Sequence, residues 1–421
     1  MKILLVNTME RRGGAAIACG RLRDALQAEG VSVKMLVAEK SSTDTSVVAI
    51  TGNLRSKLAV RARFLWEHFV IWACNGFSTK DLFSLSLGNA GKNITALPQV
   101  READIIHLHW VNQGFISLKD IKKLTRMGKP VVWTMHDMWP FTGVCHYSGD
   151  CTRYEQACGD CPKLRFPSAH DMSAWAWRHK SEYSLHGNIT FVGCSRWMAD
   201  MAAESSLTEN SKIVSIPNPI DTDVFQVKSK ADCRKSFGLP ENKRLLLFGA
   251  DRIDDERKGF SYLREALMLL SESLPKSIED IEIVVFGGQK SDALPLLPFP
   301  VHHIGRVDSV GKLVDIYNAV DVFIIPSLED NLPNTIMESL SCGTPVVGFK
   351  TGGIPEMIDH QSNGYVARNR DTEDLMNGIL WVLSADHSSL SHTAREKVMR
   401  SYSQAVVAKE YKELYAGLLE K

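Results

Sequence analysis

Two carboxylates flank a predicted phosphate-binding turn in the last third of the chain. Asp330 follows a short apolar run, Val322 to Ile325, and Glu338 lies further on, within a helix that begins near Pro333. The start of a helix offers unpaired backbone N–H groups and the positive end of the helix dipole to an anion. Carboxylates beside it can accept hydrogen bonds from sugar hydroxyls. The pattern therefore indicates a site for a phosphate that carries a sugar.

The segments around these carboxylates predict part of a parallel sheet. Val322 to Ile325 is apolar without alternation, as in a strand that is covered on both faces. The helix after it ends before Gly343, and Thr344 to Gly348 begins the next strand. Ligands of a doubly wound sheet bind beyond the carboxyl ends of its strands, and Asp330 lies at such an end.

The same segment is similar to a known family signature. Ser327 to Gly343 resembles the motif of retaining glycosyltransferase family 4, whose members have the GT-B fold. That family carries two glutamates separated by seven residues, and the matching positions here are Asp330 and Glu338. The family's Gly-Phe-Gly after the first carboxylate is replaced by Asn-Leu-Pro at 331–333, and Asp is one methylene shorter than Glu.

The resemblance implies a fold, an activity and a set of site residues. It implies two doubly wound parallel-sheet α/β domains, Rossmann-like, that face a cleft. The implied enzyme is a retaining hexosyltransferase of the surface-polysaccharide type, which moves a sugar from a nucleotide-diphosphate sugar to a hydroxyl of a glycan or lipid-linked acceptor. Glu338 would hold the ribose, and Asp330 the sugar. The donor-binding residues implied by the similarity are Gly14, Arg306, Val307, Leu332, Pro333, Asn334 and Thr335.

Two cations follow another predicted strand, Arg244 to Gly249. Arg252 and Lys258 resemble the family's pair that grips the donor diphosphate. Negative charge grows on the leaving phosphate as the glycosidic bond breaks, so fixed cations stabilise the transition state more than the ground state. Because such a pair can replace a divalent metal, we expect no catalytic metal. Without the resemblance, a solvated charged loop would be the better interpretation.

His136 is the catalytic candidate of the amino-terminal half. Thr-Met-His-Asp at 134–137 spans the end of a predicted strand, Pro130 to Met135, and matches a family segment in which the His contacts the donor sugar near the reacting carbon. By itself, a lone His before Asp is more often structural. His107 and His109 end a neighbouring predicted strand, where the polar lining of a cleft is a more common role than metal binding.

A glycine pair precedes the first predicted helix. Gly13 and Gly14 connect the strand Lys2 to Asn7 to a helix that ends near Gly30. Such a loop can hold a phosphate or let an acceptor approach the backbone, although a plain tight turn is at least as frequent. The dinucleotide spacing Gly-x-Gly-x-x-Gly is missing.

Four cysteines fall within one polar stretch. They are Cys145, Cys151, Cys158 and Cys161, and only the last two have the close spacing of a chelating pair. A structural zinc site with four thiolate ligands or a redox-labile staple is favoured over free buried thiols, and disulfides are the alternative if the loop is exported. Some members of the resembling family carry a similar cysteine loop.

The segment 53–77 combines basic and aromatic residues. Leu58, Leu65 and Phe69 recur at helical spacing, and Arg55 and Arg61 lie among them. A basic helix with exposed aromatics can lie in a membrane interface. A helix packed on the domain is an equally weighted interpretation, because other aromatics fall on different faces.

Composition limits the classes of protein that remain. The 421 residues predict two domains: an acceptor domain over 1–200, joined by a returning helix over 405–421, and a nucleotide-sugar domain over 201–404. The 49 basic and 49 acidic residues balance, which argues against a nucleic-acid partner. The apolar runs are too short to span a bilayer, and the start reads as a strand rather than a signal peptide. These features predict a cytoplasmic protein, at the inner face of the membrane if 53–77 binds lipid.

Two other classes remain open at this point. One is a GT-B epimerase or hydrolase, which would release free sugar. The other is a catalytically silent nucleotide-sugar-binding subunit, which the Asp at position 330 and the altered loop after it make plausible. The choice of base, sugar and acceptor is not encoded in any of these motifs.

Overall fold

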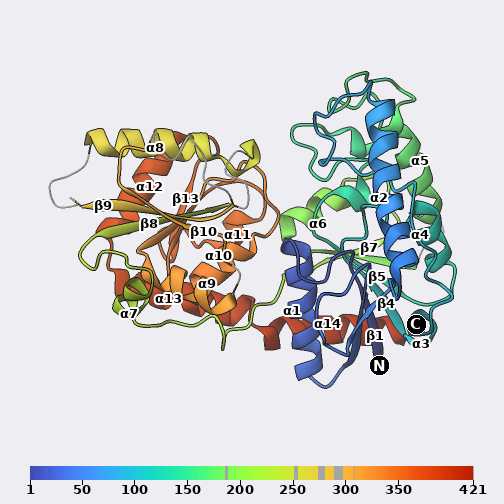
Figure 1. Ribbon diagram of the computed structural model, residues 1–421, viewed down its shortest axis with the longest axis horizontal. Coiled ribbons are helices and arrows are strands. Elements are labelled where there is room, and N and C mark those ends of the chain that lie inside the picture. Colours follow the sequence, from blue (N-terminus) through green and yellow to red (C-terminus); the bar gives the residue numbers. More distant parts are fainter. Residues whose placement is uncertain (185–187, 251–254, 274–279, 289–296, 308, 421) are drawn as a thin grey trace. The chain divides into compact units, whose positions relative to one another are not determined.

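The structure is a computed structural model that describes all residues except 185–187, 251–254, 274–279, 289–296, 308 and 421 (Figure 1). It consists of two compact units. The first comprises Met1–Pro219 together with Val407–Lys421, and the second comprises Ile220–Val406. Each unit contains one parallel sheet with helices on both faces, and each is described separately below.

The first unit continues further along the chain than the sequence-based boundary at residue 200. The strand Lys212–Ser215 lies beyond that boundary, yet it pairs in parallel with Ile189–Gly193 and completes the sheet of the first unit. No shift in composition marks this edge strand, so the sequence alone does not locate the end of the first unit. The last helix, Gln404–Leu419, joins the first unit from Val407 onward.

The sheet of the first unit has the order β3-β2-β1-β4-β5-β6-β7. Its strands are β1 (Lys2–Val6), β2 (Ser32–Val37), β3 (Val47–Ala49), β4 (Ile105–Leu108), β5 (Val131–Met135), β6 (Ile189–Gly193) and β7 (Lys212–Ser215). Its helices are α1 (Gly14–Ala28), α2 (Leu54–Cys74), α3 (Pro98–Glu102), α4 (Leu118–Thr125), α5 (Met172–Ser184), α6 (Arg196–Ala203) and α14 (Gln404–Leu419), with short 3-10 turns η1 (Trp139–Phe141) and η2 (Arg153–Glu155).

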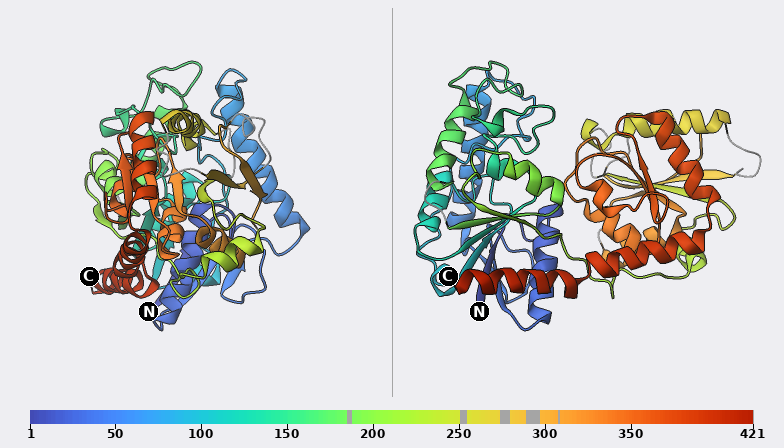
Figure 2. Two further views of the ribbon diagram at one scale, coloured as in Figure 1. Left: turned by 90° about the vertical axis from the view of Figure 1, so that its left-hand side faces the viewer. Right: turned by 180° about the vertical axis from the view of Figure 1, so that it is seen from behind.

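Both faces of this sheet are buried, as the unbroken apolar strands predict. Ile3 and Leu5 point to one face, where α1 and α14 lie side by side (Figures 1 and 2). Leu4 and Val6 point to the other face, which α4, α5 and α6 cover. Successive side chains of a strand alternate between faces, so a strand with no polar position can only sit between two apolar layers.

The sheet of the second unit has the order β10-β9-β8-β11-β12-β13. Its strands are β8 (Arg244–Ala250), β9 (Ile281–Gly287), β10 (Val301–Gly305), β11 (Val322–Ile325), β12 (Val346–Phe349) and β13 (Gly364–Ala367). Its helices are α7 (Lys230–Ser236), α8 (Phe260–Ser273), α9 (Val310–Ala319), α10 (Asn334–Ser341), α11 (Ile354–Met357), α12 (Thr372–Ser384) and α13 (His387–Ser401), with the 3-10 turn η3 (Glu256–Lys258).

The core of the second unit forms where α8 and α12 cover one face of this sheet. Leu246, Ile324 and Val347 come from three neighbouring strands and pack in one cluster with residues of both helices. The pairings of β8 with β11 and of β11 with β12 are parallel and in register. The predicted doubly wound α/β architecture and its strand at Val322 to Ile325 are confirmed.

Candidate active site

The second unit has its topological switch point between β8 and β11. The chain builds the sheet outward through β9 and β10 on one side and through β12 and β13 on the other. Ligands of open α/β sheets bind at the carboxyl ends of the strands on either side of such a point. The loops after β8, β11 and β12 meet there. They contain Lys258 in η3, Asp330 before α10, and Gly352 before α11.

Backbone contacts fix these three loops to one another. The N–H of Leu328 donates to the carbonyl of Arg257 at 2.8 Å, and the N–H of Gly353 donates to the carbonyl of Asp330 at 3.2 Å. Gly352 has φ +55°, and a Cβ there would lie 1.7 Å from the carbonyl oxygen of Asp330. Only glycine permits both this conformation and this close approach. The site therefore stands on a rigid backbone frame.

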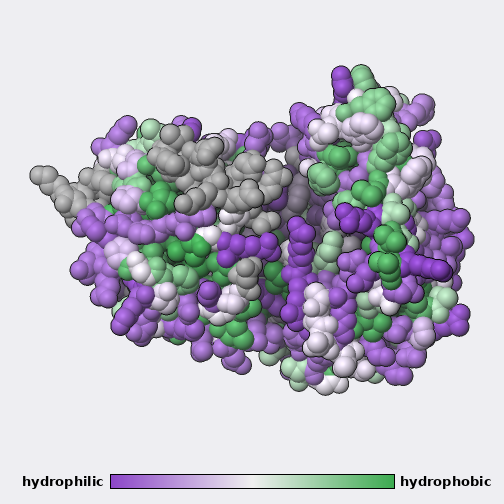
Figure 3. All heavy atoms as spheres, viewed as in Figure 1, coloured by the Kyte–Doolittle hydropathy of each residue, from purple (hydrophilic) through white to green (hydrophobic). Residues whose placement is uncertain are grey.

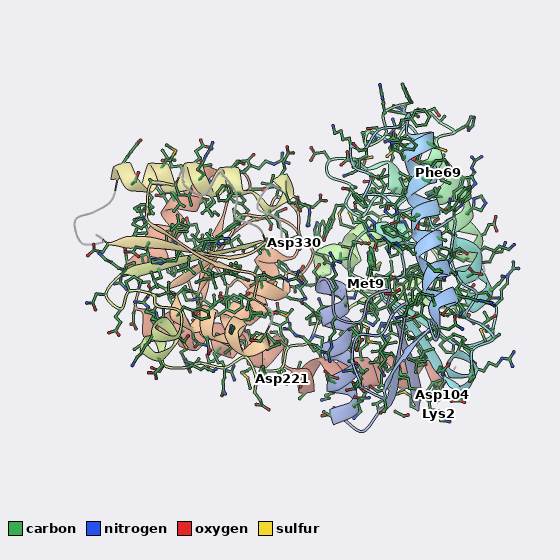
Figure 4. The ribbon with its side chains drawn as sticks, viewed as in Figure 1. Lys2, Met9, Phe69, Asp104, Asp221 and Asp330 are labelled. Atoms are coloured by element: carbon green, nitrogen blue, oxygen red, sulfur yellow. The ribbon has the colours of Figure 1, made fainter. Side chains whose placement is uncertain are left out.

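Lys258 and Asp330, both predicted as site residues, are in direct contact. The Lys258 Nζ donates to Asp330 Oδ2 at 2.7 Å, and the Arg257 guanidinium lies 4.0 Å from the same oxygen. Asp330, labelled in Figure 4, is only 9% exposed. Burial alone would raise the pKa of its carboxyl, but the charges of Lys258 and Arg257 outweigh burial and the pKa is lowered. Asp330 is therefore ionised at neutral pH.

The amino end of α10 lies directly after this pair. The helix runs over Asn334–Ser341 with Pro333 as its N-cap residue, and no side chain caps it. Its predicted flanking residue Leu332 is buried. The hydroxyl of Ser327, also buried, has no hydrogen-bond partner among the described residues. A helix start whose N–H groups have no side-chain cap, beside a buried hydroxyl, suits an anionic ligand.

Glu338 is buried one turn further along α10. It is 3% exposed, and its Oε2 accepts a hydrogen bond from the Tyr317 hydroxyl of α9 at 3.1 Å. Tyr317 was not recognised from the sequence, because a buried aromatic in an apolar helix carries no signal of its own. The contact orients the Glu338 carboxylate within the unit that also holds Lys258 and Asp330.

Two other predicted donor residues lie elsewhere in the second unit. Arg306 and Val307 follow β10, which is separated from β8 by β9. Arg306 is exposed. Arg252, predicted as the partner of Lys258, lies outside the described residues. The structure thus joins Lys258 to Asp330 and places Arg306 at the outer edge of the sheet.

In the first unit, His136 is the first residue after β5 and is partly exposed. Its Nε2 lies 2.9 Å from Nδ1 of His109, and its Nδ1 lies 3.5 Å from Sγ of Cys194. Burial lowers the pKa of His136 to about 4, although Asp137 opposes the shift. The ring is therefore neutral at neutral pH and able both to donate and to accept.

The neighbour of His136 has a structural role. Asp137 accepts hydrogen bonds from the Trp110 indole at 2.9 Å and from the Trp139 backbone N–H at 3.0 Å, and its Oδ2 lies 2.6 Å from Nδ1 of His146. These contacts bind the segment after β5 to the end of β4. They hold the backbone on which His136 sits.

Gly14, the remaining predicted residue, begins α1. Its predecessor Gly13 is the N-cap residue and has φ +90°, a conformation that favours glycine. The glycine pair therefore makes the tight turn between β1 and α1 that the sequence analysis offered as one interpretation. The turn lies at the carboxyl end of β1, next to β4 in the sheet.

The four loop cysteines line one cavity of about 20 Å³. Burial raises the pKa of Cys145, Cys158 and Cys161 to about 11 each. The backbone N–H of Gly143 donates to Sγ of Cys158 at 3.1 Å. In the part of the chain that the structure describes, no three His, Cys, Asp or Glu side chains are arranged as metal ligands. None of the four forms a disulfide in the structure, and the zinc site stays a prediction.

Sequence profiles match both halves of the chain. The profile described as "Glycosyltransferase Family 4" covers residues 12–224, and that described as "Glycosyl transferases group 1" covers residues 242–385. A curated relative, D-inositol 3-phosphate glycosyltransferase 2 of Catenulispora acidiphila, is 28% identical over 408 residues, which is 88% of each chain.

Solved structures with low sequence identity share the fold. Sucrose-phosphate synthase from Thermosynechococcus elongatus has a TM-score of 0.67 at 19% identity and covers 100% of this chain and 99% of its own. Anabaena HepE in complex with UDP-glucose has a TM-score of 0.65 at 15% identity, covering 99% and 100%. These likenesses confirm the predicted GT-B fold.

Proposed function

The chain belongs to glycosyltransferase family 4, and from this premise we propose that it transfers a hexosyl group from a nucleotide-diphosphate sugar to an acceptor hydroxyl with retention of anomeric configuration. The observation that carries the proposal is the contact of Lys258 with Asp330 at the switch point between β8 and β11. There a fixed cation and a carboxylate stand beside an uncapped helix start, as a sugar diphosphate requires.

Lys258 stabilises the departing diphosphate. As the bond from the anomeric carbon to the phosphate oxygen breaks, negative charge develops on that oxygen and its neighbours. The Lys258 ammonium group is already held by Asp330, so it needs little reorganisation to stabilise this negative charge. Stabilisation of the transition state by preorganised charges is usually the largest single contribution to catalysis. Arg252 is proposed as the second cation, and the pair takes the place of a divalent metal.

The rest of the donor lies along α10. The β-phosphate accepts hydrogen bonds from the backbone N–H groups of Asn334 and Thr335, at the start of α10. Glu338 accepts hydrogen bonds from the ribose hydroxyls, since a carboxylate is the usual ribose partner in doubly wound nucleotide sites. Arg306 and Val307 contact the base. His136 of the first unit contacts the sugar close to its anomeric carbon.

Retention follows from attack on the same face that the diphosphate leaves. The acceptor oxygen bonds to the anomeric carbon as the phosphate oxygen departs, and the acceptor proton passes to that phosphate oxygen. This route needs no protein nucleophile on the opposite face, and the site residues named here include none. A double-displacement enzyme would instead need a carboxylate there.

The acceptor is a glycan or lipid-linked molecule presented at a membrane surface. The helix α2 supports this part of the proposal. It packs on its unit through Glu67, whose Oε1 accepts hydrogen bonds from the backbone N–H groups of Leu87 and Gly88. Its other side exposes Leu54, Leu58, Leu65, Trp66 and Phe69, each more than half exposed. Hydrophobic side chains gather along this helix in Figure 3, and Figure 4 labels Phe69 on it.

Basic residues complete this surface of α2. Arg55, Lys57 and Arg61 lie in its first two turns, between the exposed leucines. Apolar side chains that enter the interface together with cations that meet anionic headgroups are typical of a helix lying on a membrane. Within the described ranges, no helix combines the length and apolarity needed to cross a bilayer.

Two experiments test the proposal. Lys258→Ala and Glu338→Gln should each lower nucleoside diphosphate release by about 10²–10³-fold, with the exposed Lys312→Ala of α9 as the matched control. A screen of uridine, guanosine and adenosine diphosphate-sugars identifies the donor first, and NMR of the product's anomeric proton reports its configuration. Wild-type rates in both site variants would overturn the assignment.

Membrane contact is measured separately, by flotation with vesicles of phosphatidylglycerol or phosphatidylcholine. We expect binding to the anionic vesicles, and its loss when Trp66 and Phe69 are both replaced by serine. Met399→Ser removes an exposed apolar side chain from α13 and serves as the control. Equal flotation of all three proteins would exclude α2 as the contact surface.

A further inference from the structure

Three polar residues stand in a row along the carboxyl edge of the first sheet. His109 is the first residue after β4, His136 the first after β5, and Cys194 the first after β6. These strands are consecutive in the sheet, and the parallel register sets Met135 opposite Gly193. The row is therefore a direct product of the strand register and not of chance contact between loops.

The two histidine rings meet edge to edge. Nδ1 of His109 lies 2.9 Å from Nε2 of His136, the ring centroids are 5.2 Å apart, and the ring planes differ by 23°. Nearly coplanar rings with facing nitrogens have the geometry of a linear hydrogen bond rather than of stacked faces. One of these two nitrogens carries a proton and the other accepts it.

Both rings are neutral, so a single proton sits on each. Burial lowers the pKa of His109 well below its ordinary value, and the neighbouring His107 and His136 lower it further. Burial also lowers the pKa of His136 to about 4. Each ring can carry its proton on either nitrogen. For His109, the hydrogen-bond partners of the two nitrogens determine which one is protonated.

The second nitrogen of His109 decides the direction of the bond. His109 Nε2 is buried and has no hydrogen-bond partner among the described residues. Unpaired buried N–H groups are rarer in proteins than unpaired acceptors, so the proton of His109 belongs on Nδ1. His109 then donates to Nε2 of His136, and the proton of His136 must sit on its Nδ1, facing Sγ of Cys194 at 3.5 Å.

We propose that His109 is a positioning residue that fixes His136 as the neutral Nδ1–H tautomer. The acceptor that faces Nδ1 is the Cys194 sulfur at 3.5 Å, and sulfur is a weak acceptor. A sugar hydroxyl oxygen is a stronger acceptor and can take over the Nδ1–H hydrogen bond. This last step rests on the proposed function, whereas the tautomer is a property of the free protein.

The tautomer is measured by two-bond ¹H–¹⁵N correlation NMR on histidine-labelled protein without any sugar. We expect the Nδ1–H pattern for His136 in the wild type. His109→Phe removes the donor and should give a mixture of both tautomers. His109→Asn should retain the wild-type pattern, because its amide nitrogen lies as many bonds from Cβ as Nδ1 does and can still donate.

Cys194→Ala is the matched control, since it removes the partner on the other side of His136. It should leave the Nδ1–H pattern unchanged. An Nε2–H pattern in the wild type, an unchanged pattern in His109→Phe, or loss of the pattern in Cys194→Ala alone would each overturn the proposal. If His109→Phe does not fold, His109→Gln, whose amide reaches further from Cβ than Nδ1 does, replaces it with the same expected mixture.

Activity provides an independent comparison. With the donor found in the screen above, His109→Phe should lower kcat several-fold more than it raises KM, and His109→Asn should recover most of the loss. Absence of glycosyl transfer in the wild type would remove the proposed function and leave the tautomer result standing. The two failures are thus distinguishable.

Discussion

The ammonium group of Lys258 lies 2.7 Å from Oδ2 of Asp330, across a separation of 72 residues. The pair joins the loop after β8 to the loop after β11. Because Asp330 already holds Lys258, its carboxylate orients the cation that is proposed to meet the diphosphate, in addition to its proposed contact with the sugar. Asp330 is one methylene shorter than the glutamate of the family motif. It can still orient Lys258, because the long lysine side chain reaches its carboxylate.

Separating the pair should destabilise the second unit. Lys258→Ala removes the ammonium group that contacts the buried Asp330 carboxylate, while Arg257 and the backbone N–H of Asn331 remain near it, and loss of a partner by a buried charged group costs about 1–3 kcal/mol. Asp330→Asn should cost less, because it removes the buried charge. In the double variant the two effects should be less than additive, which urea unfolding of all four proteins measures. Full additivity would show that the two side chains do not interact.

Acid should weaken the same contact. The folded pKa of Asp330 is lowered relative to its unfolded value of about 3.9. A lowered carboxyl pKa contributes stability that is fully present above the unfolded pKa and is lost as the pH falls through the folded pKa. Wild type should therefore lose stability relative to Asp330→Asn below about pH 4. Parallel pH profiles of the two unfolding midpoints would contradict this.

Gly352→Ala should disturb the site through its backbone. The added Cβ would meet the Asp330 carbonyl at 1.7 Å in a conformation disfavoured for alanine, and strain of this kind costs about 1–3 kcal/mol. We expect a lower melting temperature and weaker donor binding by calorimetry. The control is Gly311→Ala in α9, where nothing lies within 4 Å and alanine should stabilise the helix by about 0.5–1 kcal/mol.

Tyr317→Phe should weaken donor binding without unfolding the protein. The change removes the hydroxyl that donates to Glu338 and leaves the ring in place. The Glu338 carboxylate then loses one of the contacts that orient it, so KM for the donor should rise about 3- to 10-fold, equivalent to ~1 kcal/mol. Tyr365→Phe, which removes a hydroxyl bonded to Asp374, should leave KM unchanged.

Cys158 of the cysteine loop should react slowly with iodoacetamide. The pKa of Cys158 is raised by burial to about 11, and only the thiolate is the nucleophile. At pH 8 its labelling by mass spectrometry should lag behind that of the exposed Cys74, and the rate should rise toward pH 11. Bound zinc would instead make the labelling respond to a chelator. Rapid labelling at pH 8 in metal-free protein would contradict the raised pKa.

The sequence was most informative where chemistry and periodicity coincide. The strand at 322–325 and the helix after Pro333 were predicted from apolar runs and capping rules, because those rules act locally. The contact of Glu338 with Tyr317 was not predicted, since it depends on how α9 packs against α10. The same holds for His109 and Cys194, which reach His136 only through the register of three parallel strands.

The helix α2 illustrates a pattern that periodicity alone leaves ambiguous. Its aromatic residues fall on several faces, and the sequence therefore gave equal weight to packing and to membrane contact. In the structure the helix has one packed side and one exposed side: Ile71 is buried and Phe69 is half exposed. The side of α2 that is buried depends on where the loop that donates to Glu67 lies. Local sequence rules do not predict the position of that loop.

The place of α14 in the first unit has a consequence for biosynthesis. Tyr411 and Tyr415 pack in one cluster with Ile3 and Leu5, so the earliest and latest parts of the chain share a core. These segments are about four hundred residues apart in the chain, so the second is synthesised long after the first. The second unit can complete its core first, and one face of the amino-terminal sheet is covered by α1 but not by α14 until α14 has been made, a reversal of the usual order in which the first domain made is the first to fold.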